Sequence, residues 1–242
     1  MSTLAQPQVG WKCAVCGERV AIGTPLSWRC PNSNEHDTHH VLQIEQPIAP
    51  LRSTGDDNPY IAFRKYLAWD AFAAALGMSD DARIALIREA DAAVQGVAGT
   101  GFRFTPFARH DALSDALGFT AAGGAWVKDE THGVADSHKS RHLFTEMLHL
   151  LAAEKTGTAS WSTPNARPPL AIASCGNAAF AASTLAKAMS WPIEVFVPEN
   201  AAAELTDLLL SVGATIVRCP RLANDPPGDP CVHRFREAVA QG

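Results

Sequence analysis

The sequence predicts an α/β fold, with a parallel sheet covered by helices and a small Cys- and His-rich segment before it. Between residues 168 and 219, short apolar runs alternate with amphipathic stretches over short connections, an order typical of parallel strands joined by helices. Residues 1–55 hold three of the six cysteines and show little helical periodicity. We therefore divide the chain into a Cys/His-rich segment 1–55, a helical linker region 56–100 and an α/β region 101–242.

The composition is that of a globular protein. The 242 residues are 47% hydrophobic and carry a formal net charge of −5, which gives enough apolar material for one large or two small domains. No basic stripe favours nucleic acid, and no apolar run is long enough to cross a membrane. The first residues lack the apolar stretch of a secretory signal. We therefore expect a cytoplasmic protein whose cysteines are reduced thiols or metal ligands.

Helices are predicted within the linker region and in the α/β region that follows it. The stretches YIAFRKYLAWDAFAAAL (60–76) and DDARIALIREADAAV (80–94) carry apolar residues at three- and four-residue spacing, and Ser79 is suited to open the second. The glycines of GVAGTGF (96–102) then interrupt the pattern. Further helices are expected at 137–157, 177–190 and 201–213 and in the last residues, and strands at 124–130, 168–174, 193–198 and 214–219.

Two of these strands lead directly into helix starts, and Lys139 lies in the first turn of one such helix. Ligands of α/β folds gather at the carboxyl ends of parallel strands, where helix N-termini offer free amides. A cation there is disfavoured by the helix dipole. We expect the Lys139 amine to lie partly out of water with a lowered pKa, which would suit it to form a Schiff base with an aldehyde.

Four short motifs along this region resemble, in order, signatures of the fold-type II pyridoxal phosphate enzymes. That family includes threonine synthase, threonine and serine dehydratases and the β subunit of tryptophan synthase. The resemblance covers residues of about 100 to 220. Its motifs are Thr105-Pro106-Phe107, Lys128-Asp129-Glu130, Ser137-His138-Lys139-Ser140-Arg141 and Ser174-Cys175-Gly176-Asn177.

The resemblance implies roles for these positions. Lys139 would hold pyridoxal 5'-phosphate as a Schiff base, and Asn177 would hydrogen-bond the phenolic oxygen of its ring. Ser174, Cys175, Gly176 and Asn177 would receive the substrate carboxylate, and Cys175 would replace a serine rather than act as a nucleophile. A helix start suits an anion there. Arg141 is expected to pair with a nearby carboxylate, for which Glu130 is a candidate.

The implied activity is that of a lyase acting on a small amino acid. Lys139, once freed from the cofactor, would abstract the α-proton, and elimination or replacement at the β or γ carbon would follow, as in threonine synthase or threonine/serine ammonia-lyases. Asp136 stands where the family has a glycine, which leaves the substrate open. The full-length enzyme would be a homodimer.

The family's glycine-rich phosphate cup has no counterpart before Gly242. We therefore expect the chain to be truncated at the C-terminus, with a partial catalytic region. The alternative is a truncated, non-catalytic homologue that serves as a binding or regulatory module.

The N-terminal cysteines suggest a structural zinc site. CAVCG supplies Cys13 and Cys16, and WRCP supplies Cys30. Position 33 is Ser, so a histidine would complete a Cys₃His site: His36 is our prediction, with His39 and His40 as alternatives. A set of free thiols without metal remains the other interpretation.

Overall fold

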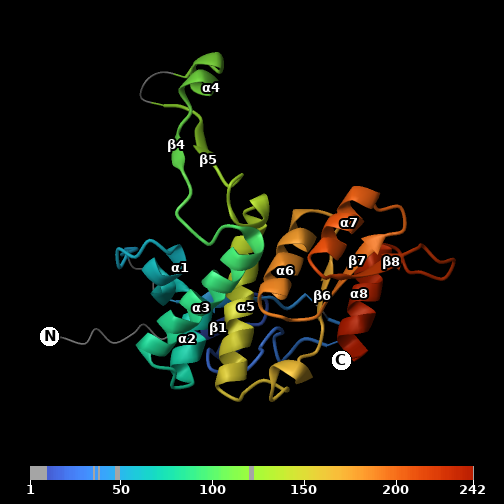
Figure 1. Cartoon of the computed structure of the whole chain (residues 1–242). Helices are drawn as coiled ribbons and strands as arrows, with labels where there is room; N and C mark the ends of the chain where they lie inside the picture. Colours follow the sequence, from blue (N-terminus) through green and yellow to red (C-terminus); the bar gives the residue numbers. More distant parts are fainter. Residues whose placement is uncertain (1–9, 35, 38, 47–49, 120–122, 242) are drawn as a thin grey trace. The chain divides into compact units, whose positions relative to one another are not determined.

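The structure is a computed structural model that describes residues 10–34, 36–37, 39–46, 50–119 and 123–241. The chain forms two compact units, one of residues 1–89 and 145–166 and one of residues 90–144 and 167–242. The division falls within the two longest helices, α3 (Asp80–Ala98) and α5 (Lys139–Lys155) (Figure 1). The three-region division made from the sequence stays a prediction.

The first unit begins with a small antiparallel sheet. Its strands are β1 (Gly10–Cys13), β2 (Arg19–Ala21) and β3 (Leu42–Glu45), in the order β2-β1-β3. Such short strands leave no clear alternation in the sequence, so the sheet was not predicted. Arg19 and Glu45 form a two-bond ion pair over its surface, with Nε–Oε2 at 2.7 Å and Nη2–Oε1 at 2.9 Å.

Helices supply the apolar core of the first unit. The predicted first helix is broken into α1 (Pro59–Ala62), the 3₁₀ turn η1 (Arg64–Tyr66) and α2 (Ala68–Ala75). The break occurs at extended Leu67, which precedes α2. The stretch predicted at 80–94 is part of α3. The most buried large side chains here come from α2, α3 and α5: Trp69, Phe72, Leu86, Ile87, Met147 and Leu148.

A buried carboxylate joins these helices. Asp70 is 1% exposed, and its Oδ1 accepts from Arg83 Nε at 2.8 Å and lies 3.5 Å from Arg64 Nη1. Asp80 pairs with both arginines from the start of α3. The two buried guanidinium groups are thereby neutralised, as buried charges must be.

His149 on α5 lies among aromatic rings in the same unit. Its ring stacks on Phe72 at a centroid distance of 4.0 Å and lies 5.6 Å from the ring of Trp28. Burial lowers the pKa of His149 to about 4, because the charged imidazolium is poorly solvated there. His149 is therefore neutral in the folded protein at pH 7.

The second unit contains the predicted parallel sheet. Strands β6 (Leu170–Ala173), β7 (Ile193–Pro198) and β8 (Thr215–Cys219) run parallel in the order β6-β7-β8. Helices α6 (Asn177–Ala188) and α7 (Ala203–Ser211) connect them, and α8 (Pro230–Gln241) follows (Figure 1). The alternation read from the sequence is confirmed for these elements.

One face of this sheet is covered by α8. Ala173 is level with Phe196, and Phe196 with Val217, so these side chains share a face. Phe196 forms a buried cluster with Cys219 and with Cys231 of α8. The residues immediately before these in each strand point to the opposite face, where the crossover helices α6 and α7 belong: Ile172, Val195 and Ile216.

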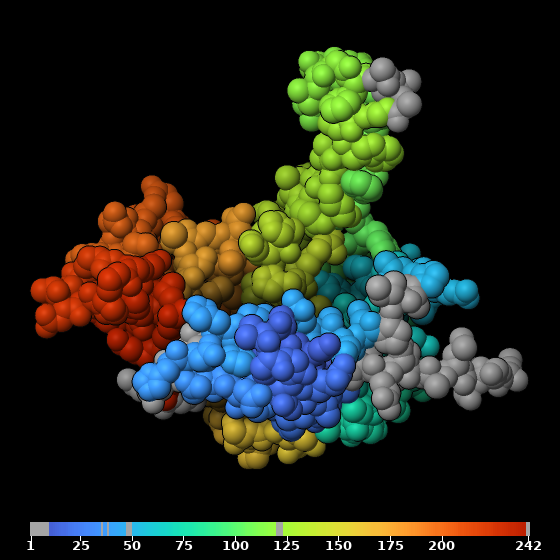
Figure 2. All heavy atoms as spheres, turned by 180° about the vertical axis from the view of Figure 1, so that it is seen from behind, coloured from blue at the N-terminus to red at the C-terminus, as the bar shows by residue number. Residues whose placement is uncertain are grey.

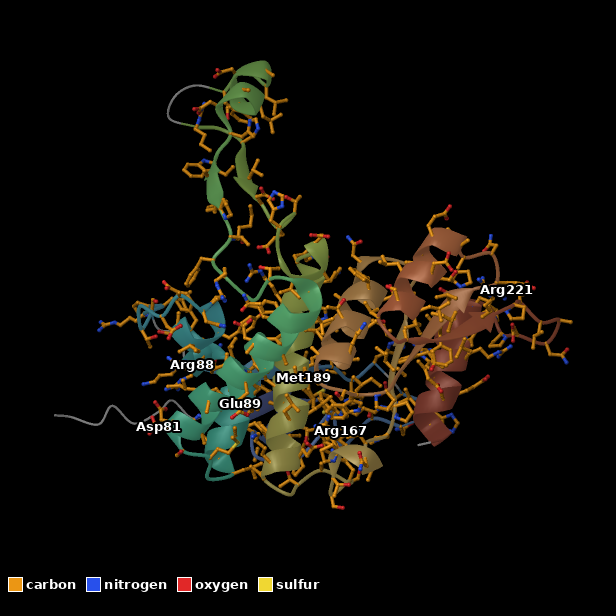
Figure 3. The ribbon with its side chains drawn as sticks, viewed as in Figure 1. Asp81, Arg88, Glu89, Arg167, Met189 and Arg221 are labelled. Carbon is orange, nitrogen blue, oxygen red and sulfur yellow. The ribbon has the colours of Figure 1, made fainter. Side chains whose placement is uncertain are left out.

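Polar contacts tie the beginning of β6 to the end of α6. Arg167 Nη1 donates to the Met189 carbonyl at 2.7 Å (Figure 3). Its guanidinium lies 4.4 Å from the centroid of the Trp191 ring, and Trp191 Nε1 donates to the Pro168 carbonyl at 2.8 Å. The strand therefore begins at a fixed place relative to the helix that follows it.

One strand lies elsewhere than the sequence predicts. β5 (Trp126–Lys128) pairs antiparallel with β4 (Phe107–Arg109) in a separate two-stranded ribbon, with α4 (Asp111–Ala116) between them in the chain. The expectation that this strand leads to the edge of the parallel sheet is therefore wrong. None of the helices in the described residues combines the length and apolar character needed to cross a membrane.

We expect acidification to destabilise the first unit through His149. In the unfolded chain the imidazole takes up a proton near pH 6.5, whereas in the folded protein it does so near pH 4. The unfolded state binds more protons between these values, so the stability present above pH ~6.5 falls with pH, by at most ~1.4 kcal/mol per pH unit.

Urea unfolding at pH 7 and pH 5 measures this effect. His149→Gln removes the titrating ring and should flatten the pH dependence of the free energy of unfolding. Equal pH dependence in the variant and the unmodified chain would contradict the assignment.

Candidate cofactor site

Lys139 is the first residue of α5, and serines around it fix the start of the helix. Ser137 is 3% exposed and extended, and its Oγ accepts from the Lys139 backbone N–H at 3.1 Å. Ser140 Oγ donates to the Ser137 carbonyl at 2.8 Å. The serines of the SHKSR motif thus hold the backbone at the lysine.

The Lys139 side chain is exposed. Within the part of the chain that the structure describes, no acceptor or carboxylate contacts its amine. From the sequence we expect an amine that neighbouring residues partly remove from water. Among the residues described here the side chain is exposed, so they do not provide the expected shielding from water. What the structure offers at this position is a free primary amine at a helix start.

The backbone just before Lys139 is unusual. The turn η2 (Val134–Asp136) contains two successive non-glycine residues with positive φ, Ala135 at 54° and Asp136 at 48°. This left-handed region costs L-residues energy that glycine avoids. Asp136 is the residue that the sequence marked as standing where glycine is usual. The structure gives that position the conformation for which glycine is suited.

Glu130 anchors the loop that carries these residues. Its carboxylate accepts from Thr105 Oγ1 at 2.6 Å and from Arg141 Nε at 2.8 Å. The Arg141 guanidinium also donates to the Arg103 carbonyl at 2.9 Å. Burial favours a higher pKa for Glu130, but the bonds from Thr105 and Arg141 outweigh it, so the pKa is lowered and the group is ionised. The predicted pairing of Arg141 with Glu130 is confirmed.

The second predicted segment, residues 174–177, connects β6 to α6. Ser174 N–H donates to the Phe196 carbonyl at 3.2 Å, which holds the loop at the end of the sheet. Gly176 is the N-cap of α6 and offers no side-chain cap. A Cβ placed at Gly176 would meet no atom within 4 Å. Cys175 and Asn177 are exposed. Within the part of the chain that the structure describes, the loop therefore lies at an exposed helix start.

The structure brings η2 against α6 within the second unit. A cavity of about 310 Å³ has walls from Ala135 and Asp136 on one side and from Phe180 and Thr184 of α6 on the other, with His132 nearby. Lys139 and Asn177 are not among the described residues that line it. His132 and Thr184 could not be found from the sequence, because their position depends on how η2 packs against α6.

The N-terminal cysteines meet in the first unit, but with a different histidine. Cys13, Cys16, Cys30 and His40 place their ligand atoms within 4.8 Å of one another. His36, our prediction for the fourth ligand, is not part of this group among the described residues, because the fold places His40 there instead, with its Nδ1 3.4 Å from Cys13 Sγ. His40 was one of the two alternatives.

The thiols of this group are electrostatically unequal. The pKa of Cys13 is lowered to about 6, first by the backbone N–H of Cys16, whereas burial raises the pKa of Cys30 to about 11. The pKa of His40 is raised, chiefly by its contact with Cys13.

Comparison with known proteins identifies one family whose model matches part of this chain. The family model described as pyridoxal-phosphate dependent enzyme matches residues 99–242. Among curated proteins no significant sequence match was found.

Solved structures show partial similarity. Maize serine racemase aligns over 65% of this chain and 41% of its own, with 17% identity and a TM-score of 0.43. Diaminopropionate ammonia lyase from Escherichia coli aligns over 65% of this chain and 39% of its own, with 22% identity and a TM-score of 0.47. The chain thus spans about two fifths of the length of these proteins. Because the family model matches more than half of the sequence, including Lys139 and Asn177, this chain belongs to the pyridoxal-phosphate-dependent enzyme family.

Proposed function

We propose that this chain binds pyridoxal 5'-phosphate through Lys139 and takes part in a lyase reaction on a small amino acid. The reaction would begin with abstraction of the α-proton and continue by elimination or replacement at the β or γ carbon. The observation that carries the proposal is the place of Lys139 as the first residue of α5, within the residues 99–242 that match the pyridoxal-phosphate-dependent family. A primary amine is the group that links to an aldehyde.

The surroundings of Lys139 fit the cofactor. Ser137 and Ser140 fix the backbone at the lysine, and Glu130 fixes the loop before it by holding Arg141. Arg141 therefore serves the position of Lys139 rather than the chemistry. A reactive group mounted on a rigid element can be held in one geometry relative to a substrate.

Residues 174–177 fit the carboxylate of an amino acid. The start of α6 carries unpaired backbone N–H groups and the positive end of the helix dipole, both of which favour an anion. Ser174 adds a hydroxyl donor and Asn177 an amide donor. Asn177 would also donate to the phenolic oxygen of the cofactor ring. Cys175 is exposed, but no base is seen in contact with its thiol among the described residues, so we assign it no nucleophilic role.

Each group then has a limited task. The cofactor, when bound, supplies an electron sink for the charge left on the α-carbon. The Lys139 amine accepts the α-proton and can return it. The loop 174–177 holds the carboxylate and so orients the bond to be broken.

Between threonine synthase-like replacement and ammonia-lyase-like elimination, the described residues favour neither. We further propose a homodimer and a cytoplasmic location, in keeping with the six free thiols of the chain.

A binding or regulatory module without catalysis is the second candidate. The exposure of Lys139 favours it, because an amine in bulk water is held less firmly than one in a closed site. The two candidates differ in whether the cofactor becomes linked to Lys139.

Labelling of Lys139 tests the proposal directly. The purified chain is incubated with pyridoxal phosphate, reduced with borohydride and digested, and the modified peptides are quantified by mass spectrometry. We expect label on Lys139 at about one equivalent, lost in Lys139→Ala. Lys187→Ala is the control, because Lys187 is an exposed lysine of the same unit that donates to the Ser211 carbonyl. Label spread equally over exposed lysines would contradict the proposal and favour the non-catalytic module.

The strained turn before Lys139 gives a second test. Asp136→Gly should stabilise the protein by about 0.5–1 kcal/mol, because glycine adopts positive φ without the cost that an L-residue has there. Asp136→Ala is the matched comparison: it removes the same carboxylate but keeps the Cβ, and should be less stable than Asp136→Gly by ~1 kcal/mol. Urea unfolding measures both. Equal stability of the two variants would show that the turn is not strained.

A further inference from the structure

We propose that the N-terminal module, defined as residues 10–46, binds one zinc ion through Cys13, Cys16, Cys30 and His40 and needs that ion to fold. The inference goes beyond the proposed function and does not depend on it, because the module belongs to the first unit and the family model begins at residue 99. The module is the blue segment of the surface in Figure 2.

The distances are those of a tetrahedral metal site. Cys13 Sγ lies 3.4 Å from His40 Nδ1, and Cys16 Sγ lies 3.6 Å from Cys30 Sγ. All four ligand atoms lie within 4.8 Å of one another. A zinc ion with bonds of ~2.3 Å to sulfur and ~2.0 Å to nitrogen separates its ligand atoms by about 3.5–3.8 Å. The four atoms therefore need only small shifts to enclose an ion.

The donor set selects zinc among common metals. Three thiolates and an imidazole are soft or borderline ligands, whereas Mg²⁺ and Ca²⁺ require oxygen ligands. A Cys₃His set fills the four positions of tetrahedral zinc. No position remains for water or substrate, so the ion has a structural role.

Groups around the ligands orient them for a metal. Asp37 Oδ2 lies 3.2 Å from His40 Nε2, so the protonated Nε2 donates to the carboxylate and the lone pair of Nδ1 is left for the ion. Val15 N–H donates to Cys13 Sγ and Asn32 Nδ2 to Cys16 Sγ, each at 3.4 Å. Donors to the sulfurs stabilise the negative charge that thiolates carry.

Two tight turns and one strand contact bring the ligands together. In the first turn, Gly17 N–H donates to the Cys13 carbonyl at 3.0 Å with φ of 77° at Gly17. In the second, Ser33 N–H donates to the Cys30 carbonyl at 2.9 Å. His40 enters from the segment before β3, whose Val41 carbonyl accepts from Ala14 N–H at 2.9 Å. Two cysteine turns facing one another across a small sheet are a geometry that metal ligation explains.

The module has almost no apolar core of its own. Of its described side chains, only Cys13 and Cys30 are buried, at 1% and 2% exposure, and both are proposed ligands. Its strands have three or four residues. Small domains without a sufficient core need disulfides or metals to fold. Here the buried centre consists of the ligands themselves, so the ion would replace the missing core.

A disulfide between Cys16 and Cys30 is the competing explanation for their proximity. It would not explain why Cys13 lies beside His40, or why Asp37 contacts His40. All six cysteines are free in the structure. We therefore commit to the metal and make the disulfide an outcome of the experiment.

The experiment uses the full chain, purified under reducing conditions, with zinc measured by mass spectrometry and free thiols by a chromogenic reagent. We expect about one zinc per chain and a tetrahedral thiolate spectrum after exchange with Co²⁺. His40→Ala should weaken zinc binding by at least ~100-fold and Asp37→Asn by about 10–100-fold. His36→Ala is the matched control, a nearby exposed histidine outside the cluster, and should bind zinc like the unmodified chain.

Hydrogen exchange then tests the dependence of folding on the ion. Removing zinc with a chelator should raise exchange throughout residues 10–46 while leaving β6, β7 and β8 unchanged. Lack of bound metal, equal losses in His36→Ala and His40→Ala, or a module held by a Cys16–Cys30 disulfide would each overturn the proposal. None of these readouts involves pyridoxal phosphate, so the result is independent of the test on Lys139.

Discussion

The carboxylate of Glu130 is the point on which the candidate cofactor site depends. Thr105, Glu130 and Arg141 belong to three motifs that are up to 36 residues apart in the chain, and all three meet at this carboxylate. Lys128 adds a bond from its Nζ to the Thr105 carbonyl at 2.6 Å. Three of the four motifs thus each supply one part of a single hydrogen-bond network near the start of α5.

The same network explains how a strained turn can persist beside Lys139. A loop held only at its distant ends would relax Ala135 and Asp136 out of the left-handed region. Here Glu130 is fixed on one side of η2, and the Ser137 and Ser140 contacts fix α5 on the other. Backbone strain is maintained where the surrounding structure determines the conformation. We therefore relate the backbone strain at Ala135 and Asp136 to the fixed position of Lys139.

The parallel sheet could be predicted from the sequence because its strands are mostly apolar, with Glu194 of β7 and Arg218 of β8 as charged exceptions. Val195 and Val197 of β7 have 0% exposure, and Phe196 between them has 3%, so both faces of the strand are buried and its sequence reads as one apolar run. The strands β4 and β5 have three residues each, and the sequence cannot show which strand such a segment will join. Pairing of β5 with β4 is decided by contacts remote in the chain.

The proposed metal ligands also divide into those that the sequence could predict and one that it could not. Cys13 and Cys16 are linked by a local turn, and such turns leave a spacing that can be read in a sequence. The histidine is chosen by where the chain returns after Cys30, and that path depends on the pairing of β3 with β1. His36 and His40 are chemically equivalent in the sequence, and only the strand pairing separates them.

The parallel sheet of the second unit and the N-terminal module differ in the side chains that they bury. The sheet of the second unit is held by apolar side chains, whose burial does not depend on redox state or on metal supply. The N-terminal module places thiols and an imidazole where other small sheets place apolar residues. With zinc bound as we propose, its stability would vary with the availability of zinc and with the reduction of its thiols.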